Sequence, residues 1–502
     1  MPETRTGYVK KNILWGNISN IVLTVLSFVS RTVFIYVLGA KYLGVSGLFT
    51  NILGILSFSE LGIGSAINYS LYKPIAEKDN EKIIALMKLY KTAYRIIAVV
   101  VATLGVILFP FLEYFVNTDI PMNEIRVFYL IFLFNTVSSY FVTYKTSYVS
   151  ALQKNYVVTN INTLGQIATY IAQLICIWII PDYTLYLLVQ AVIGLLQKVI
   201  MSWYINNKYP ILKERGDYKV DEPTKKELVK NVKALVIHKV GEVCVHQTDN
   251  IVISVFINTL TVGVMSNYIM LNATIEKFTG IIFNSFTASF GNLIAKENKE
   301  KQREIFELYD FMGFWIYGFV FIAFVTLSQP FISLWLGEKM LVDNFTMILY
   351  FVCGYLTGQC VVTYNFKVAA GKFNEDKWVA FVQSFVNIVV SITAVKMIGL
   401  PGVYVGTIAQ RLIVNVVRPI TVYKYVLKQS SLIYFRRFLL RGSLVASIAY
   451  LMSLLSKVVL VKLTWGSFLL MTILTAILPN VIILLIYGRS DMFKSVIARL
   501  RK

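Results

Sequence analysis

Histidine and cysteine are scarce in this chain, and their scarcity excludes two kinds of site. The only two histidines, His238 and His246, lie eight positions apart with no third ligand at a suitable spacing. Because a zinc site normally needs three or four protein ligands, we expect no metal centre. Two of the four cysteines, Cys353 and Cys360, lie seven positions apart, which is ~10 Å along one helix and too far for a disulfide. We interpret the cysteines as packing residues.

The chain also lacks a cleavable signal and any pattern of alternating strands. The segment before the first apolar run is short and polar, and no small-residue cleavage site follows it. Alternating segments of about ten residues, typical of a membrane barrel, are missing. Instead, 57% of the residues are hydrophobic, the mean hydropathy is +0.65, and long apolar runs recur from end to end. These features predict an all-α, multi-pass membrane protein.

We predict about fourteen membrane-spanning helices from these apolar runs. They are 13–38, 43–71, 92–116, 125–149, 157–180, 183–205, 232–257, 260–291, 305–328, 345–369, 378–398, 401–427, 433–457 and 463–487. The connections between them are too short to hold a separate catalytic domain. We therefore expect no catalytic residues and no enzyme activity.

The sequence repeats itself over more than half of its length. The segment Ile75–Lys82 returns as Ile294–Lys301, 219 positions later. Further matches at offsets of 219 or 220 are Leu89-Tyr90 with Leu308-Tyr309, Gly44 with Gly263, Val142-Thr143-Tyr144 with Val362-Thr363-Tyr364, Gln190 with Gln410, and Lys198 with Arg418. Duplicated halves of this kind are typical of membrane transporters.

The repeat predicts how the chain is organised. Six spans in each half is an even number, so both halves enter the membrane in the same direction and the repeat is parallel. We predict a first six-helix lobe at 1–205, a cytoplasmic linker at 206–231 and a second six-helix lobe at 232–427. The remainder, 428–502, then holds a helix hairpin and a basic cytoplasmic tail.

The Lys and Arg residues are concentrated in alternate connections between the predicted spans. The chain has 48 Lys and Arg against 27 Asp and Glu, and the basic residues concentrate at the termini and in the even-numbered connections. The positive-inside rule then places both termini in the cytoplasm. Because topology accounts for the charge, we expect no nucleic-acid partner. The longest connection, Asn206–Asn231, carries seven Lys or Arg, and we expect it to contact anionic headgroups of the lipid bilayer.

Ionisable residues inside spans are costly, so each is a functional hypothesis. Arg31 lies ~10 Å from the outer end of the first span, and the repeat places it opposite Asn250, next to Asp249. A gating or substrate-sensing pair is one interpretation. The alternative is that each charge is satisfied within its own lobe, or that Arg31 extends to the interface.

Other acidic residues inside spans are candidates for coupling or gating. Glu60 lies midway along the second span, where it either binds a proton or cation or makes a structural hydrogen bond. Lys239, Glu242, Glu276 and Lys277 lie in the seventh and eighth spans. They form either a mutually satisfied network or a site for a cation, a proton relay or an anion.

Three cations lie towards the cytoplasmic ends of the sixth and twelfth spans. Lys198 and Arg418 are related by the repeat, and Arg411 is seven residues before Arg418 on the same helix face. Together they suit a diphosphate group, which Arg binds in bidentate fashion and Lys as a point charge. Extension to the interface is the alternative for Lys198 and Arg418.

Three sequence blocks resemble those of Wzx-type polysaccharide transporters. The first runs from Arg31 to Gly44 (RTVFIYVLGAKYLG), the second from Glu60 to Ala66 (ELGIGSA) with Leu71 to Pro74 (LYKP), and the third from Thr248 to Ser254 (TDNIVIS). These transporters are lipid-linked oligosaccharide flippases of the multidrug/oligosaccharidyl-lipid/polysaccharide (MOP) exporter superfamily. The order of the blocks, together with the spans, extends the resemblance over essentially the whole chain.

The resemblance implies two six-helix lobes, a cationic central cavity and alternating access. The substrate would be an undecaprenyl-diphosphate-linked oligosaccharide repeat unit for O-antigen, capsule or a related polysaccharide, moved across the bacterial inner membrane. The implied partners are a polysaccharide polymerase and a chain-length regulator. No cofactor is implied, and H+ or Na+ is a possible coupling ion.

Three other functions stay open at this point. A lipid II flippase or a cation-coupled drug exporter of the same superfamily has the same spans, although a drug exporter for cations should carry more acids than bases. A membrane-bound polymerase or ligase is a different class. The short outer connections argue against it.

The topology predicts a labelling pattern. Cysteines introduced at Asp119, Asp182 or Asp343 should react with an impermeant thiol reagent added outside the cell, because the charge rule places these residues outside. Cysteines at Asn80, Asp217 or Asn298 should not react. The reversed pattern would refute the orientation.

Overall fold

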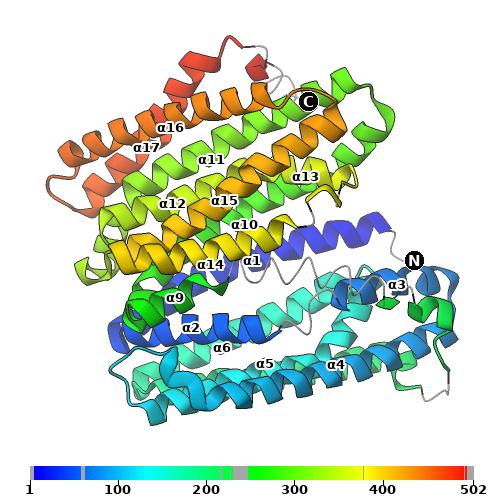
Figure 1. The fold of residues 1–502 in the computed structure, drawn as a ribbon. Helices are drawn as coiled ribbons and strands as arrows, with labels where there is room; N and C mark the ends of the chain where they lie inside the picture. The colour runs from blue at the N-terminus through cyan, green and yellow to red at the C-terminus, as the bar shows by residue number, and fades with distance from the viewer. Residues whose placement is uncertain are drawn as a thin grey trace. The chain divides into compact units, whose positions relative to one another are not determined.

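A computed structural model gives the fold as an assembly of helices (Figure 1). It describes residues 5–57, 63–214, 218–226, 228–229, 247–372, 374–376, 378–490 and 492–494, and these residues contain no β-strand. By internal contacts the chain divides into two compact units, Met1–Gly263 and Val264–Lys502. The all-helical prediction is confirmed.

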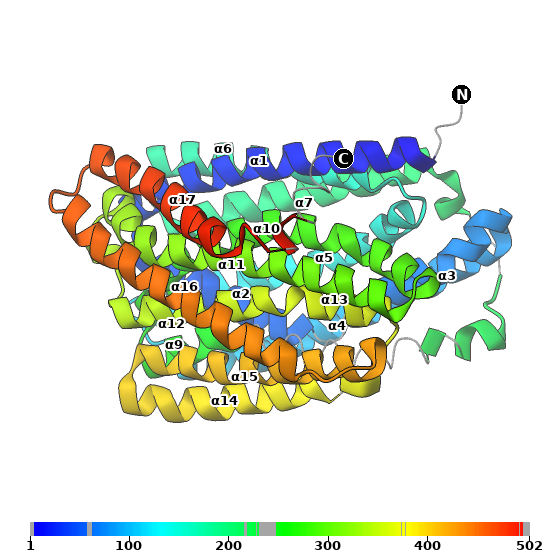
Figure 2. The same cartoon turned by 90° about the horizontal axis from the view of Figure 1, so that it is seen from above.

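The first unit holds the helices of the N-terminal half. They are α1 (Arg5–Val37), α2 (Ala40–Leu56), α3 (Ile63–Glu77), α4 (Asn80–Leu108), α5 (Met122–Ala151), α6 (Asn155–Ile179), α7 (Tyr183–Lys208), the short 3-10 helix η3 (Pro210–Lys213), α9 (Asp249–Phe256) and the start of α10 (Thr259–Lys296). The long helices α1 and α6 run side by side (Figure 2). Phe34, Tyr183 and Phe128 lie in the main hydrophobic core of this unit.

The second unit holds the rest of α10 and the helices that follow it. They are α11 (Lys299–Leu336), α12 (Asn344–Gln359), α13 (Val361–Ala369), the 3-10 helix η5 (Asn374–Asp376), α14 (Val379–Ile398), α15 (Leu400–Thr421), the π-helical turn η6 (Val422–Leu427), α16 (Leu432–Val459) and α17 (Trp465–Tyr487). Helices α14 and α15 form a hairpin packed along its length (Figures 1 and 2). Its close packing depends on Gly402 and Gly406, where added Cβ atoms would lie 2.2 Å from the backbone of Ala394 and 2.0 Å from Ser391 Oγ.

Among the described residues, eleven helices are long and apolar enough to cross a membrane. Each coincides with one of the predicted spans. Large apolar side chains on their outer surfaces are exposed, for example Trp178 at 85% and Leu485 at 79%. Exposed apolar surface on this scale is what contact with lipid requires.

The other three predicted spans differ from the described helices. The span predicted at 43–71 is divided between α2 and α3. The span at 260–291 corresponds to α10, which carries polar residues along its length and is not among the eleven apolar helices. For the span at 232–257 the structure describes only the end, where a new helix, α9, begins at Asp249 after a bend at Thr248. The described part of this span is therefore interrupted at Thr248.

The repeat is visible in how two long helices begin. At the start of α4 the Asp79 side chain accepts a hydrogen bond from the backbone N–H of Lys82 at 3.0 Å. At the start of α11, 219 residues later, Asn298 accepts from the N–H of Lys301 at 2.9 Å. Asp and Asn are both preferred N-caps because a short side-chain oxygen satisfies a free N–H of the first turn. The repeated segment thus encodes the same helix start twice.

Repeat-related glutamines also make similar contacts. Gln190 on α7 accepts from Gln173 on α6 at 3.2 Å, and Gln410 on α15 accepts from Gln383 on α14 at 2.9 Å. In each unit an amide pair therefore joins the two helices of a hairpin. Such pairs satisfy polar groups that would otherwise face hydrocarbon.

The C-terminal helices are attached to α11 by charge. Arg441 on α16 donates to Asp310 on α11 at 2.6 Å, and both side chains are buried. One turn earlier, Arg437 lies 2.9 Å from Glu307. Two ion pairs thereby join α16, the first helix of the predicted C-terminal hairpin, to α11.

Helices α2 and α10 cross at two glycines that the repeat had paired. A Cβ added to Gly44 would lie 1.8 Å from the carbonyl oxygen of Thr259, and one added to Gly263 would lie 2.0 Å from that of Ala40. These contacts are reciprocal, because Ala40 and Thr259 are also 219 positions apart. Only glycine allows two backbones to approach so closely.

This crossing predicts the effect of one added methyl group. Gly263→Ala should lower the apparent melting temperature of the purified protein and its yield, since overpacking costs ~1–3 kcal/mol and here the obstacle is backbone. Gly291→Ala on the same helix is the matched control, because nothing lies within 4 Å of its added Cβ. Equal stability of the two variants would show that the crossing is not required.

Candidate functional site

Arg31 lies at a junction of three helices in the first unit. It extends from α1 and is half-buried, and the hydroxyl groups of Tyr170 on α6 and Tyr186 on α7 are near enough to interact with its charge. Phe34 lies one turn after Arg31 on α1. The Tyr186 ring packs edge-on against the Phe34 ring, with 5.0 Å between the ring centroids. The guanidinium is thus positioned by aromatic packing among polar hydroxyls, well inside the apolar length of α1.

Lys198 is held by a neighbouring helix. Its ammonium group on α7 donates to the carbonyl of Asn135 at 3.0 Å and to Ser138 Oγ at 2.7 Å, both on α5. Two of the three ammonium N–H donors are used in these bonds. This favours a structural role in joining α7 to α5, with at most one donor left for a ligand.

Arg418, the repeat partner of Lys198, belongs to a buried charge cluster in the second unit. Its guanidinium lies 4.7 Å from the Tyr364 ring centroid and its Nε lies 3.9 Å from Asp376 Oδ2. The same carboxylate pairs with Lys367, which is 1% exposed. The cluster joins α13, η5 and α15, so most of the Arg418 charge serves internal packing. Neither Lys198 nor Arg418 extends freely to the interface.

Arg411 and Glu276 are neighbours in the second unit. Glu276 on α10 accepts a hydrogen bond from Asn272 at 2.9 Å, and the charge of Arg411 on α15 acts on the same carboxylate. A predicted phosphate-directed cation therefore lies beside a predicted coupling acid. Protonation of Glu276 would remove the negative charge that offsets Arg411. Lys277, the next residue, is exposed.

Asp249 occupies the first position of α9 and is half-buried. A carboxylate there is favoured by the free N–H groups at the helix start. Just before it, the carbonyl of Gln247 accepts from Asn51 of α2 at 3.1 Å, which attaches this segment to the first unit. The repeat assigns α9 to the second lobe, and that division of the chain stays a prediction.

Several predicted residues lie outside the described part of the chain. They are Glu60, Lys239 and Glu242, together with His238, His246 and Cys244. Cys176, Cys353 and Cys360 are described and are not joined to one another by disulfides. Within the described residues, no group of three His, Cys, Asp or Glu is arranged to hold a metal ion.

Sequence reasoning missed several charges that the structure buries. Lys145, Lys367, Asp310 and Arg441 are each at most 9% exposed. The available signal was their position, because each falls inside a predicted span. Each of these charges, like that of Arg31, needs a partner within the protein.

The chain was compared with protein families and with solved structures. The profile of a family described as polysaccharide biosynthesis protein matches residues 9–290, which include all three sequence blocks noted above. A comparison with curated proteins finds no match.

Solved structures show the same fold at low identity. A lipid II flippase, MurJ, in an inward closed conformation has a TM-score of 0.64 and 15% identity, covering 95% of this chain and 100% of that chain. An inward-facing multidrug resistance MATE transporter of the MOP superfamily has a TM-score of 0.59 and 15% identity, covering 86% of this chain and 98% of that chain. A MATE transporter from Vibrio cholerae has a TM-score of 0.55 and 14% identity, covering 84% of this chain and 99% of that chain.

These comparisons confirm the resemblance read from the sequence blocks. The family profile covers more than half of the 502 residues, and the structural matches extend the same fold over nearly the whole chain. The chain belongs to the polysaccharide biosynthesis protein family and has the fold of the MOP exporter superfamily.

Proposed function

We propose that this protein is a flippase for lipid-linked oligosaccharides. It moves undecaprenyl-diphosphate-linked repeat units from the cytoplasmic to the outer leaflet of the bacterial inner membrane by alternating access, for O-antigen, capsule or a related polysaccharide. The family match over residues 9–290 carries this proposal. We further propose that both termini are cytoplasmic, that the protein has no catalytic activity, and that a polymerase and a chain-length regulator act with it.

The charges inside the apolar helices support a substrate with phosphate groups. Arg31 lies near the hydroxyl groups of Tyr170 and Tyr186, and the charge of Arg411 acts on the Glu276 carboxylate. Guanidinium groups bind phosphate oxygens in bidentate fashion. Lys198 and Arg418 have internal partners within hydrogen-bonding or ion-pair distance, so the phosphate-binding role that we propose falls to Arg31 and Arg411.

The superfamily contains other functions, and transport assays separate them. The similar structures include a lipid II flippase and a multidrug resistance transporter. Purified protein in vesicles should translocate a short-chain lipid-diphosphate oligosaccharide. Translocation of lipid II alone, or drug export alone, would contradict the proposal.

Removing Arg31 or Arg411 should reduce translocation. A charge-assisted hydrogen bond is worth ~1.5–3 kcal/mol, so we expect at least a roughly tenfold loss in Arg31→Ala and Arg411→Ala at normal protein levels. Cells carrying these variants should accumulate lipid-linked precursor in the cytoplasmic leaflet. Arg31→Lys should recover part of the activity if a point charge suffices and little if bidentate geometry matters.

Arg489→Ala is the control for loss of charge, because Arg489 is exposed and follows the last span. It should translocate substrate as the unmodified protein does. Full activity in both Arg31→Ala and Arg411→Ala would show that these cations are structural and that the site assignment is wrong.

Glu276 tests whether a coupling ion acts beside Arg411. If Glu276 binds H+ or Na+, Glu276→Gln should make the translocation rate insensitive to an imposed gradient of that ion while preserving binding of the substrate. Rates are compared in vesicles with and without each gradient. A Glu276→Gln variant that keeps its full response to the gradient would remove Glu276 from the coupling mechanism.

A further inference from the structure

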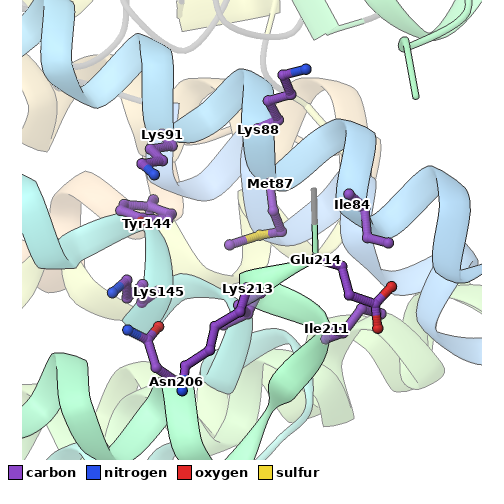
Figure 3. A pocket seen from close by; sticks show the side chains of 11 residues that line it. Ile84, Met87, Lys88, Lys91, Tyr144, Lys145, Asn206, Ile211, Lys213 and Glu214 are labelled. Atoms are coloured by element: carbon purple, nitrogen blue, oxygen red, sulfur yellow. The ribbon is translucent and has the colours of Figure 1, made fainter. Parts of the chain in front are cut away.

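A pocket lined by four lysines lies in the first unit, away from Arg31. It has a volume of about 720 Å³ and is formed by α4, α5, the end of α7 and η3. We call it the lysine pocket, after Lys88, Lys91, Lys145 and Lys213 (Figure 3). Glu214 is the one acidic residue among its described lining residues, so the lining carries three more positive than negative charges.

Lys145 is the buried member of the group. It lies on α5 with 9% of its surface exposed, and its ammonium donates inward to Ser202 Oγ on α7 at 2.6 Å. Among the described residues, no carboxylate lies within 4.0 Å of this ammonium. A lysine at the end of a membrane helix usually extends to water, whereas this one does not.

The other lysines make the burial of Lys145 less favourable. The ammonium groups of Lys91 and Lys213 are both near enough to repel it. In Figure 3 the ammonium groups of Lys91 and Lys145 lie on either side of the Tyr144 ring, and the Glu214 carboxylate lies on the far side of the view from them. Like charges gathered around a buried cation are unfavourable unless an anion offsets them.

The pocket walls suit an anion with an organic part. Met87 and Ile84 of α4 add apolar surface to the lining beside Lys88 and Lys91, and Tyr144 contributes an aromatic face. Lysines bind phosphate as point charges and tolerate varied geometry. The lining lies where α4 begins and where α5 and α7 end, at the helix ends that the charge rule places in the cytoplasm.

The segment after α7 closes one side of the pocket. Lys213 belongs to η3 and donates to Asn207 at 3.0 Å. Further along, Lys82 of α4 lies 3.2 Å from Asp221, and hydrogen bonds from Thr224 lower the pKa of the Asp221 carboxyl to about 2. The connection that was expected to contact headgroups thus folds back onto α4.

We propose that the lysine pocket is a binding site for a phosphate-bearing anion with two or more negative charges. The bound anion would bridge Lys91 of α4, Lys145 of α5 and Lys213 of η3, and so attach the connection after α7 to the helix ends. The source of the phosphate is either the headgroup of an anionic lipid or a soluble phosphate ester. This inference does not depend on the transported substrate.

Binding of inorganic pyrophosphate to the purified full-length protein tests the proposal. Calorimetry at constant ionic strength should show saturable binding, because salt screens only the non-specific part of the attraction. The double variant Lys91→Gln/Lys213→Gln removes two exposed charges without disturbing the buried lysine, and it should weaken binding about tenfold or more. Lys145→Gln should weaken it further.

Lys208→Gln is the matched control. Lys208 is exposed at the end of α7, five residues from Lys213, and does not line the pocket. It should bind pyrophosphate as the unmodified protein does. Equal weakening by Lys208→Gln and by the double variant would mean that the attraction is non-specific, and the proposal would fail.

Nanodiscs distinguish the two sources of phosphate. If a lipid headgroup occupies the pocket, discs of phosphatidylcholine and phosphatidylglycerol in equal parts should weaken pyrophosphate binding relative to phosphatidylcholine alone. If the pocket takes a soluble ester, binding should be equal in both. Absence of saturable binding in detergent and in both kinds of disc would overturn the proposal. Translocation by the pocket variants is a separate measurement, so the two proposals fail independently.

Discussion

The structure depends on one constraint, which is that a charge inside an apolar helix must find its partner within the protein. Lipid offers none, and an unpaired charge there is expensive. The pair Arg441–Asp310 meets this requirement by joining two helices that are distant in sequence. Asp376 pairs with Lys367, nine residues before it, and also lies 3.9 Å from Arg418 of α15. Removing one member of such a pair would leave the other buried and unsatisfied. These pairs therefore determine which helices are held together.

The same constraint sorts the cations by function. Lys198 and Arg418 have partners within hydrogen-bonding or ion-pair distance, and their charge is largely used for packing. Arg31 lies near the hydroxyl groups of Tyr170 and Tyr186. Lys145 lies among other lysines. The lysines gathered around Lys145 are the place where we propose that an anion binds.

Close backbone contact is the second means of holding the helices. Gly44 and Gly263 allow α2 and α10 to cross closely. At each glycine, a backbone carbonyl oxygen of the other helix occupies the space that a Cβ atom would need. The two glycines are related by the repeat, so a duplicated position meets its own copy. Gly402 and Gly406 have a similar role in the α14–α15 hairpin. Small residues serve this purpose in membranes because packing, rather than exclusion of water, drives helix association there.

The sequence by itself determined the helical class, the positions of eleven apolar helices, the repeat and the family resemblance. These are properties of composition and of spacing along the chain, and the shared caps Asp79 and Asn298 are encoded in single short segments. Only the tertiary structure decided which charges meet. The pairing of Arg441 with Asp310, the proximity of Glu276 to Arg411 and the gathering of Lys91, Lys145 and Lys213 each depend on how separate segments are brought together in space. The sequence shows where a charge lies along a helix. Helix packing determines which groups surround that charge and therefore whether it serves packing or is available to a ligand.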